Sequence, residues 1–327
     1  MTIPRGKIVY ENLDSSIINF AELLSNLNAT EFTGYMQFNL PGLDGIFYLE
    51  NGKITDAFCE NADNKQMGQD AVNEIIAKIK VKENSGKINV FEMPGDIVKL
   101  LANLGKGEIV YQDLSNDFSS LENLLTKLKN EGHNGYLEIS TDDKKTTALI
   151  FLQQGEPVKS IMSTPEHVAS KPVQSQDIID VTSKTKVTFN VYKAALSLSD
   201  SREHLITVYE INEILEVWAA IINAIEKQTD PKTFTKVFKQ TLIDKADEYP
   251  FLDPFATEFQ YADAKASFEG DATKDFNKGL AESLQITMSN LGIPGATVKE
   301  FQNIKNQFAD IINKYSFNNE LNKLITS

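Results

Sequence analysis

Apolar and polar residues alternate near the start of the chain in a way that predicts a short strand and then an amphipathic helix. The run Ile8-Val9-Tyr10 combines β-branched and aromatic residues, which favour a strand. The helix is predicted because the next apolar residues recur at helical spacing: Ile17, Phe20, Leu23, Leu24 and Leu27. Asp14 or Ser15 stands in front of this helix as its candidate N-cap.

Further strands and a second helix are predicted up to residue 92. The strands are expected at 35–38, 46–49, 54–58 and 87–92, and the helix at 66–80. One face of that helix is apolar, with Ala71, Val72, Ile75, Ile76 and Ile79. Asn51-Gly52 is the dipeptide that favours a type I′ hairpin turn. The expected order is therefore β-α-β-β-β-α-β, with a mostly antiparallel sheet.

This unit occurs twice in the sequence. The segment from Gly6 to Leu13 returns 101 residues later as Gly107 to Leu114. Residues 6–39 and 107–140 share 10 identities in 34 ungapped positions. After a two-residue insertion, the match resumes in the two predicted hairpins. The pattern indicates a tandem duplication, which should be sought before any single element is interpreted.

The second copy differs from the first in its later part. Pro157 follows its hairpin turn and cannot donate a ladder hydrogen bond, so that strand is expected to be short or to lie at the edge of the sheet. Pro165 and Pro172 interrupt the following segment, where no helix as long as 66–80 is evident. We expect the second copy to be the more degraded of the two.

The last third of the chain changes to long helical patterns. Ser199-Asp200-Ser201 is the candidate cap for the first of them, and Pro231 after Asp230 marks the start of the second. The helices are expected at 204–228, 231–245, 273–291 and 296–315, with a marginal one at 318–325. Short alternating runs occur at 258–261 and 266–268.

These patterns predict an α+β protein of three domains. Residues 1–102 and 103–198 are expected to form two tandem α+β repeats, each a mostly antiparallel sheet with helices, the second diverged. Residues 199–327 are expected to form a C-terminal domain rich in α-helix.

The first repeat also resembles a known domain family. The resemblance rests on Phe32-Thr33-Gly34-Tyr35, on the run from Gly45 to Ile54, on Asp56-Ala57, and on Gly68 with Ala71. This pattern is similar to the PATAN-type domain, a prokaryotic domain often attached to response-regulator receivers. The resemblance implies a regulatory or protein-interaction role without catalysis, and it supplies no set of functional residues. It covers 6–93 well and 107–192 loosely.

Composition narrows the functional classes. The net charge of −14 argues against nucleic-acid binding, where a basic surface is expected. No apolar run approaches the roughly 18–20 residues of a membrane span, and the N-terminus lacks a signal-peptide pattern. One cysteine excludes an intrachain disulfide, so a cytoplasmic location is expected. Of the 32 basic residues only Arg5 and Arg202 are arginines, which argues against phosphate-reading sites. The alternative interpretation of this bias, together with the abundant Asn and Ile, is an AT-rich genome.

No catalytic, cofactor-binding or metal-binding constellation is evident. His133, His167 and His204 stand in three unrelated contexts and are interpreted as surface residues. Cys59 is interpreted as a small buried hydrophobic residue. The paired carboxylates Asp142-Asp143 are interpreted as a solvated turn.

One segment suggests a function: the acidic and aromatic residues that follow the helix predicted at 231–245. Aromatic residues rimmed by acids are typical of protein interfaces, so this segment is a candidate partner-binding site. Its residues are Asp247, Glu248, Tyr249, Phe251, Asp253 and Phe255. Two alternatives are a loop that closes the helix pair, with Phe251 and Phe255 in the core, and a metal site.

Two functions from different classes follow from the sequence. The first is a non-enzymatic cytosolic adaptor without cofactors, which docks signalling proteins such as receivers, small GTPases or a motility motor; this partner list comes from the resemblance. The alternative is a sensor that binds a small molecule or ion between the repeats or under the helical domain. An enzyme would have to rely on carboxylates alone. Nucleic-acid partners and membrane insertion are not expected, and the oligomeric state stays open.

Overall fold

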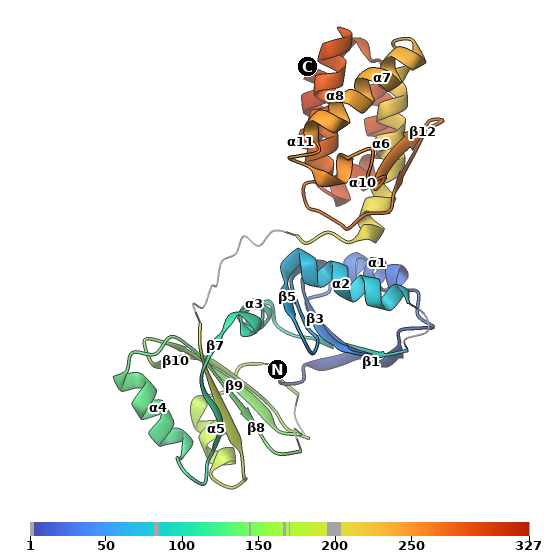
Figure 1. Ribbon diagram of the computed structural model, residues 1–327. Coiled ribbons are helices and arrows are strands. Elements are labelled where there is room, and N and C mark those ends of the chain that lie inside the picture. Colours follow the sequence, from blue (N-terminus) through green and yellow to red (C-terminus); the bar gives the residue numbers. More distant parts are fainter. Residues whose placement is uncertain are drawn as a thin grey trace. The chain divides into compact units, whose positions relative to one another are not determined.

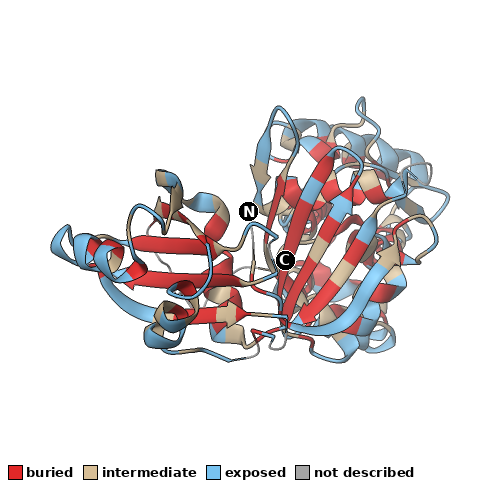
Figure 2. Ribbon diagram, turned by 90° about the horizontal axis from the view of Figure 1, so that it is seen from below, coloured by how far each residue is buried: buried red, intermediate tan, exposed pale blue. Residues whose placement is uncertain are grey.

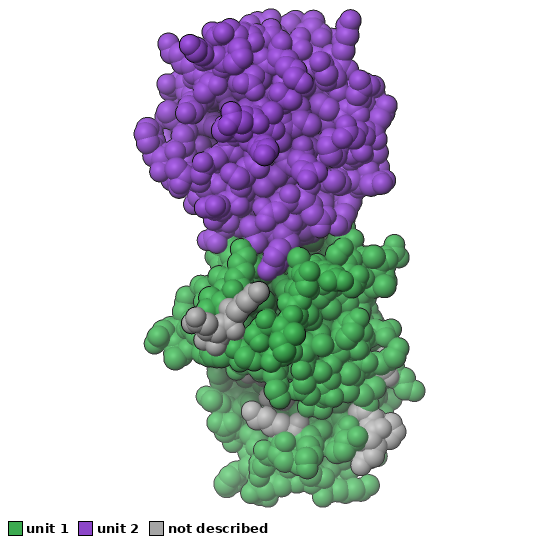
Figure 3. Space-filling model, turned by 90° about the vertical axis from the view of Figure 1, so that its right-hand side faces the viewer, with its two compact units in different colours: residues 1–205 green, residues 206–327 purple. Residues whose placement is uncertain are grey.

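The computed structural model divides the chain into two compact units, Met1–Leu205 and Ile206–Ser327, which Figure 3 shows in two colours. It describes residues 3–81, 85–143, 145–165, 168–169, 171–194 and 204–326. Both predicted repeats lie in the first unit and the helical region forms the second. The proposed boundary at 198/199 and the cap at Ser199-Asp200-Ser201 fall outside the described residues.

The first repeat is a six-stranded antiparallel sheet with helices. Figure 1 shows α1 and α2 packed on one face of this sheet. Its elements are β1 (Lys7–Asp14), α1 (Phe20–Ala29), β2 (Gly34–Leu40), β3 (Leu43–Glu50), β4 (Lys53–Glu60), β5 (Lys65–Met67), α2 (Gly68–Lys80), β6 (Lys87–Glu92) and α3 (Gly95–Leu101). The strand order is β1-β6-β2-β3-β4-β5. The predicted order is confirmed, with β5 and α3 as additions that the sequence pattern did not show.

Among its described residues, the second repeat reproduces this sheet without a counterpart of β5. A short 3₁₀ turn, η1 (Leu104–Lys106), leads into β7 (Glu108–Ser115), α4 (Leu121–Asn130), β8 (Gly135–Ser140), β9 (Thr147–Gln153), β10 (Glu156–Ser163), α5 (Ser175–Thr182) and β11 (Thr188–Lys193). The order β10-β9-β8-β11-β7 matches that of the first sheet, strand for strand. β10 carries Pro157 and lies at the edge, as predicted, although it is not shortened. The α+β duplication is confirmed.

The two copies contain corresponding tyrosine hydrogen bonds and aromatic ring contacts. The Tyr35 hydroxyl donates to the Pro4 carbonyl, and the Tyr136 hydroxyl donates to that of Leu104. Tyr35 stacks on Phe91, and Tyr136 stacks on Tyr192, 101 residues further on in both cases. The duplication therefore extends from sequence to individual hydrogen bonds and ring contacts.

The start of the first helix differs from the prediction. Residues 14–18 form a turn, and α1 begins at Phe20 with Asn19 as its N-cap, whose side chain accepts from the Glu22 N–H. The expected cap at Asp14 or Ser15 is therefore wrong. Asp14 instead accepts hydrogen bonds from Ser16 within the turn. Ile17 lies outside the helix and is 82% exposed.

Each sheet has one face covered by its own helices, and its other face takes part in a joint core. The helix-covered core of the second repeat includes Leu124, Leu128, Leu137, Ile150 and Phe189. The opposite faces of both sheets meet in a second cluster, which contains Tyr35, Ile46 and Phe91 with Tyr136, Leu149 and Phe151. Four residues of α3 lie in the same cluster: Ile97, Val98, Leu100 and Leu101. In Figure 2 the inner strands are mostly buried, while the edge strands β1 and β7 are largely exposed.

The second unit is helical with one β-hairpin. It contains α6 (Val208–Glu226), α7 (Pro231–Lys245), η2 (Pro250–Leu252), β12 (Phe259–Ala262), β13 (Lys265–Phe268), α8 (Phe276–Leu291), η3 (Gly295–Thr297), α9 (Glu300–Gln307), α10 (Ala309–Lys314) and α11 (Asn318–Thr326). α7 has the predicted bounds, with Asp230 as N-cap and Pro231 at its first position. The two short alternating runs pair as the hairpin.

Two predictions for this unit were wrong in detail. α6 begins at Val208, because Thr207 and Glu210 form a capping box. The single helix expected at 296–315 is divided into η3, α9 and α10. Phe308 separates the last two and lies outside the helical region of the backbone, with φ −109° and ψ 22°.

Candidate functional site

The acidic and aromatic segment 247–255 is only partly at the surface. Tyr249 is 3% exposed and Phe251 is 4% exposed, so neither can form an exposed aromatic patch. Phe251 stacks on Phe276 of α8, with ring centroids 5.1 Å apart. Both residues were wrongly assigned to a partner-binding surface, because the 3₁₀ turn η2 directs this segment back into the core of the helical unit.

The acids of this segment make local contacts. Glu248 accepts from the Lys245 ammonium at 2.7 Å, and hydrogen bonds from Lys245 and Tyr249 lower the pKa of its carboxyl. Asp253 accepts from the Phe255 N–H at 2.9 Å, and Asp247 is exposed. Phe255 is 83% exposed, against the alternative that placed it in the core. Phe255 is thus the aromatic residue of the predicted site that a partner could contact.

A stronger surface feature was missed in the sequence. Ile17 of the first repeat and Phe118 of the second occupy equivalent positions, 101 residues apart, in the loop between the first strand and the first helix. They are 82% and 85% exposed. We call these two residues the loop tips. Their equivalence could have been found by aligning the repeats, but the helical spacing of Ile17 from Phe20 obscured it.

Both loop tips stand on anchored loops. In the first repeat, Ser15 N–H donates to the Gly86 carbonyl, and Asp14 accepts from the Ser85 hydroxyl. In the second, Asn116 N–H donates to the Val187 carbonyl, and its side chain bonds Thr182 and Thr185. Each loop is therefore tied to the segment that precedes the last strand of its own repeat, which fixes the position of the tip.

The edge strands next to these loops also expose apolar side chains. Ile8, Val9 and Tyr10 of β1 are 39–44% exposed, and Ile109 and Val110 of β7 are 54% and 41% exposed. Both strands contain register shifts typical of β-bulges. Bulges twist an edge strand and hinder pairing with another strand. The exposed side chains, rather than the strand backbones, are therefore the accessible feature of these edges.

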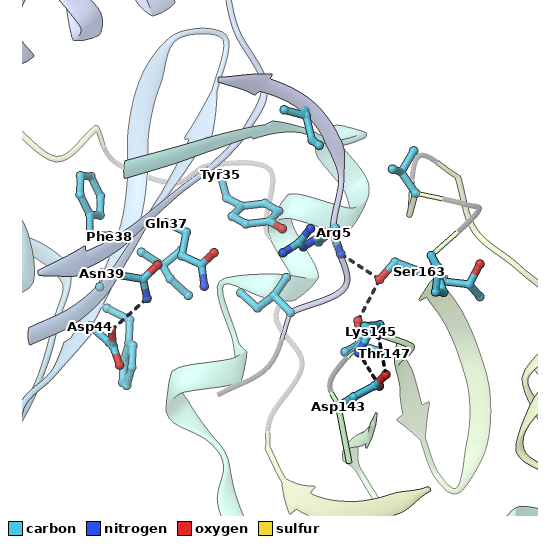
Figure 4. Close-up of a pocket in the computed structure, with 18 of the residues that line it drawn as sticks. Arg5, Tyr35, Gln37, Phe38, Asn39, Asp44, Asp143, Lys145, Thr147 and Ser163 are labelled. Carbon is cyan, nitrogen blue, oxygen red and sulfur yellow. Dashed lines mark hydrogen bonds and ion pairs between the residues drawn. The ribbon is translucent and has the colours of Figure 1, made fainter. Parts of the chain in front are cut away.

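A cavity of about 790 Å³ lies between the two repeats within the first unit, and Figure 4 shows it in close-up. The first repeat supplies residues of β2, β3 and β4, among them Gln37, Asn39 and Asp44 on the face opposite α1 and α2. The second supplies Thr147 of β9 and Ser163 of β10. A volume of this size is typical of small-molecule sites, which occur preferentially at domain interfaces.

Arg5 is held in this cavity by its backbone. Its N–H donates to the Ser163 hydroxyl at 3.1 Å, and its carbonyl accepts from the Ala169 N–H at 2.6 Å. Its side chain is 68% exposed, with an ion pair to Glu11 at 3.8 Å. In Figure 4, Arg5 lies between Tyr35 of the first repeat and Ser163 of the second. One of the two arginines in the chain is thus fixed at the junction of the repeats.

The other titratable residues singled out in the sequence have structural contacts. Cys59 is buried, as predicted, and burial together with the nearby Glu74 charge raises the pKa of its thiol to about 11. The His133 ring contacts the Tyr192 carbonyl at 3.0 Å, and the His204 ring contacts that of Ile54 at 3.2 Å. Neither is a freely solvated surface histidine. His167 lies outside the described residues.

The described residues contain no group of three or more His, Cys, Asp or Glu side chains that could hold a metal ion. None of the helices there combines the length and the apolar character that a bilayer span requires.

The structure defines the class of this protein as two tandem sheet-and-helix repeats followed by a helical unit. The chain belongs to the family of uncharacterised proteins conserved in archaea (DUF2226), whose model matches it twice, at residues 1–105 and 102–195. The two matches coincide with the two repeats. No curated protein and no solved structure matches the chain.

Proposed function

We propose that this chain is a non-enzymatic adaptor that docks protein partners through its repeats. The observation that carries the proposal is the pair of loop tips, Ile17 and Phe118. Both are more than four-fifths exposed at equivalent points of two copies that otherwise share few residues.

The loop tips are largely solvent-exposed and are not part of the core of their repeats. A side chain this exposed contributes little burial energy to its own unit, whereas covering it with a partner would contribute about 1.5–3 kcal/mol. Anchoring the loops lowers the entropic cost of binding, because the tips are already positioned. Two equivalent tips on one chain also allow a partner with two sites to bind both, which raises avidity.

The resemblance to the PATAN-type domain supports the same class of function. It suggests receivers, small GTPases with their regulators, or a motility motor as partners. The proposal places the protein in the cytoplasm, where such signalling proteins act.

The test uses the unaltered chain and its variants as baits in a lysate of the source organism and identifies the captured proteins. The affinity of each identified partner is then measured for each chain. The double variant Ile17→Ser with Phe118→Ser is expected to lose roughly tenfold or more in affinity. Met67→Ser is the matched control, since Met67 is 37% exposed on β5, which has no counterpart in the second repeat. Phe255→Ser tests the predicted site in the helical unit.

The outcomes are distinct. Loss of binding only in the double variant assigns docking to the repeats, and loss only in Phe255→Ser assigns it to the helical unit. If no partner is captured, or if every variant binds as the unaltered chain does, the adaptor proposal is refuted.

A second candidate function is a small-molecule sensor with its site between the repeats. The cavity of about 790 Å³ at that junction favours it. Its general test is a ligand-dependent rise in the melting temperature of the full chain, because a ligand that binds only the native state must stabilise it.

A further inference from the structure

We propose that the cavity between the repeats binds a small zwitterion, an amino acid or short peptide, whose carboxylate contacts Arg5 and whose ammonium contacts Asp44. This inference rests on the second candidate function, since it names the class of ligand for that cavity. It depends on which polar groups line the two sides of the cavity.

One side of the cavity offers hydrogen-bond donors, together with the Asp143 carboxylate, which accepts from the Thr141 hydroxyl and pairs with the Lys145 ammonium at 3.3 Å. The Arg5 guanidinium is a planar fork suited to a carboxylate, and its ion pair with Glu11, at 3.8 Å, is long and exposed. The fixed backbone of Arg5 restricts where that fork can reach. Apart from Arg202, every other basic residue of the chain is a lysine, so an arginine at this junction is a departure from its composition.

A buried pair of hydroxyls lies beside Arg5. Thr147 is 4% exposed, Ser163 is 3% exposed, and their oxygens are 2.9 Å apart. The Ser163 oxygen also accepts from the Arg5 N–H. The two hydroxyls share one hydrogen bond, so one of their two hydrogens is left to donate to a ligand. A carboxylate that contacts Arg5 would provide the acceptor for this hydrogen.

The other side of the cavity is formed by polar residues of the first sheet, of which Gln37 and Asn39 are amides and Asp44 carries a negative charge. Asp44 lies at the start of β3 and accepts from the Asn39 amide at 3.0 Å, which leaves its second oxygen for a cationic donor. Gln37 lies on the same face of β2 as Asn39, between Asp44 and Arg5 in Figure 4. Asp44 would repel a dianion, whereas a zwitterion satisfies both sides at once.

Because the chain contains only two arginines, a change at the Arg5 side chain can be followed directly by NMR. The arginine Nε–Hε region of a ¹⁵N correlation spectrum should contain signals from Arg5 and Arg202, and Arg202→Lys assigns them. Glycine, glycylglycine and triglycine serve as zwitterions of three lengths. Their N-acetyl and C-terminal amide derivatives remove one charge each. Affinities are measured by calorimetry on the full chain.

We expect at least one zwitterion to bind and to shift the Arg5 signal, and we expect either derivative to bind on the order of tenfold more weakly. Arg5→Lys keeps the charge but loses the fork, and should weaken binding by a similar factor. Asp44→Asn should remove the preference for the free ammonium over its N-acetyl derivative. Lys106→Gln is the control, because Lys106 occupies the position of Arg5 in the second repeat and pairs with Asp56 at 2.7 Å outside the cavity.

Three results would overturn the inference. Binding that leaves the Arg5 signal and the Arg5→Lys affinity unchanged would exclude Arg5 as the carboxylate contact. Stabilisation by a different chemical class, with no heat from any zwitterion, would refute the ligand class and keep the sensor function. No stabilisation by any class in a broad thermal-shift panel would refute both.

Discussion

Two glycines in the hairpin turns provide the sharpest test of the duplicated architecture. Gly52 and Gly155 have φ values of +78° and +77°, and each turn lies against the C-terminal part of the first helix in its repeat. A Cβ at Gly52 would lie 2.4 Å from Asn28 Cα, and one at Gly155 would lie 2.3 Å from Lys129 Cα. Both contacts are with backbone, which cannot rotate away. Gly42 is the control, since its φ is +75° and nothing lies within 4 Å of its added Cβ.

The expected magnitudes follow from these contacts. Gly42→Ala incurs only the left-handed backbone cost, about 1 kcal/mol. Gly52→Ala and Gly155→Ala must also displace the turn from the helix, at about 1–3 kcal/mol. They weaken the hydrogen bonds from Gly52 N–H to the Phe32 carbonyl and from Gly155 N–H to that of His133, both 2.7 Å long. We therefore expect a loss of about 3–5 kcal/mol for each, from a typical stability of about 5–15 kcal/mol.

Urea unfolding monitored by far-ultraviolet circular dichroism measures these losses. Trp218, the one tryptophan of the chain, is fully buried in the helical unit, and its fluorescence reports that unit separately. We expect the glycine variants to leave the fluorescence transition in place. The steric argument fails if Gly52→Ala costs no more than Gly42→Ala. The equivalence of the repeats fails if Gly52→Ala and Gly155→Ala differ by more than about 1–2 kcal/mol.

Three further predictions address single groups. Iodoacetamide should alkylate Cys59 slowly at pH 8 in the native chain and fully in guanidinium, measured by intact mass, since burial raises the pKa of the thiol to about 11. Fast labelling of the native chain would contradict this prediction. The buried thiol contributes stability below its unfolded pKa, and that stability is lost as the pH rises toward 11. Asn89→Ala and Asn190→Ala should each cost about 1 kcal/mol by urea unfolding, because their side chains accept from the bulge N–H groups of β1 and β7 at 2.7 and 2.8 Å. Thr207→Ala should lower the Trp218 fluorescence midpoint, with a loss of about 1 kcal/mol for the capping box of α6, and an unmoved midpoint would exclude that role.

The elements that could be predicted are those whose signals are local. Asn51 and Gly52 have φ values of 50° and 78°, as the type I′ turn requires, so the hairpin followed directly from the dipeptide. The same holds for α7, where Asp230 caps the helix and Pro231 opens it. Neither signal depends on which other parts of the chain lie nearby.

The elements that were missed depend on packing between distant segments. α3 has only seven residues, and its apolar side chains Ile97, Val98, Leu100 and Leu101 lie in the core that the two sheets share. Seven residues are too few to show a helical period, which is recognised over windows of about 11–18 residues. Tyr249 and Phe251 present the same difficulty in reverse. Their acidic neighbours indicate a surface, and only contacts with α8 show that the rings lie inside.

A ligand site between the repeats was predicted only as the alternative function, and the residues that line it could not be predicted, since the cavity exists only where the two repeats meet. The rarity of arginine was interpreted as evidence against phosphate-reading sites. Composition describes the average surface, and a single fixed Arg5 is enough to form one contact with a carboxylate.

Comparison of the two copies separates residues that the fold needs from residues that it does not. Some positions that form repeated contacts keep their residue, as with Tyr35 and Tyr136 or Asn89 and Asn190. The cavity positions have diverged, since Arg5 and Gln37 correspond to Lys106 and Glu138. A ligand site formed between the two copies requires such differences between equivalent residues, because the residues of one copy face the ligand in different surroundings from those of the other.

The loop tips belong to neither group of positions. Ile17 and Phe118 are both apolar, although neither side chain is buried in the chain. Shared exposure of this kind favours a role outside the fold, and docking a partner is the role that would use both tips.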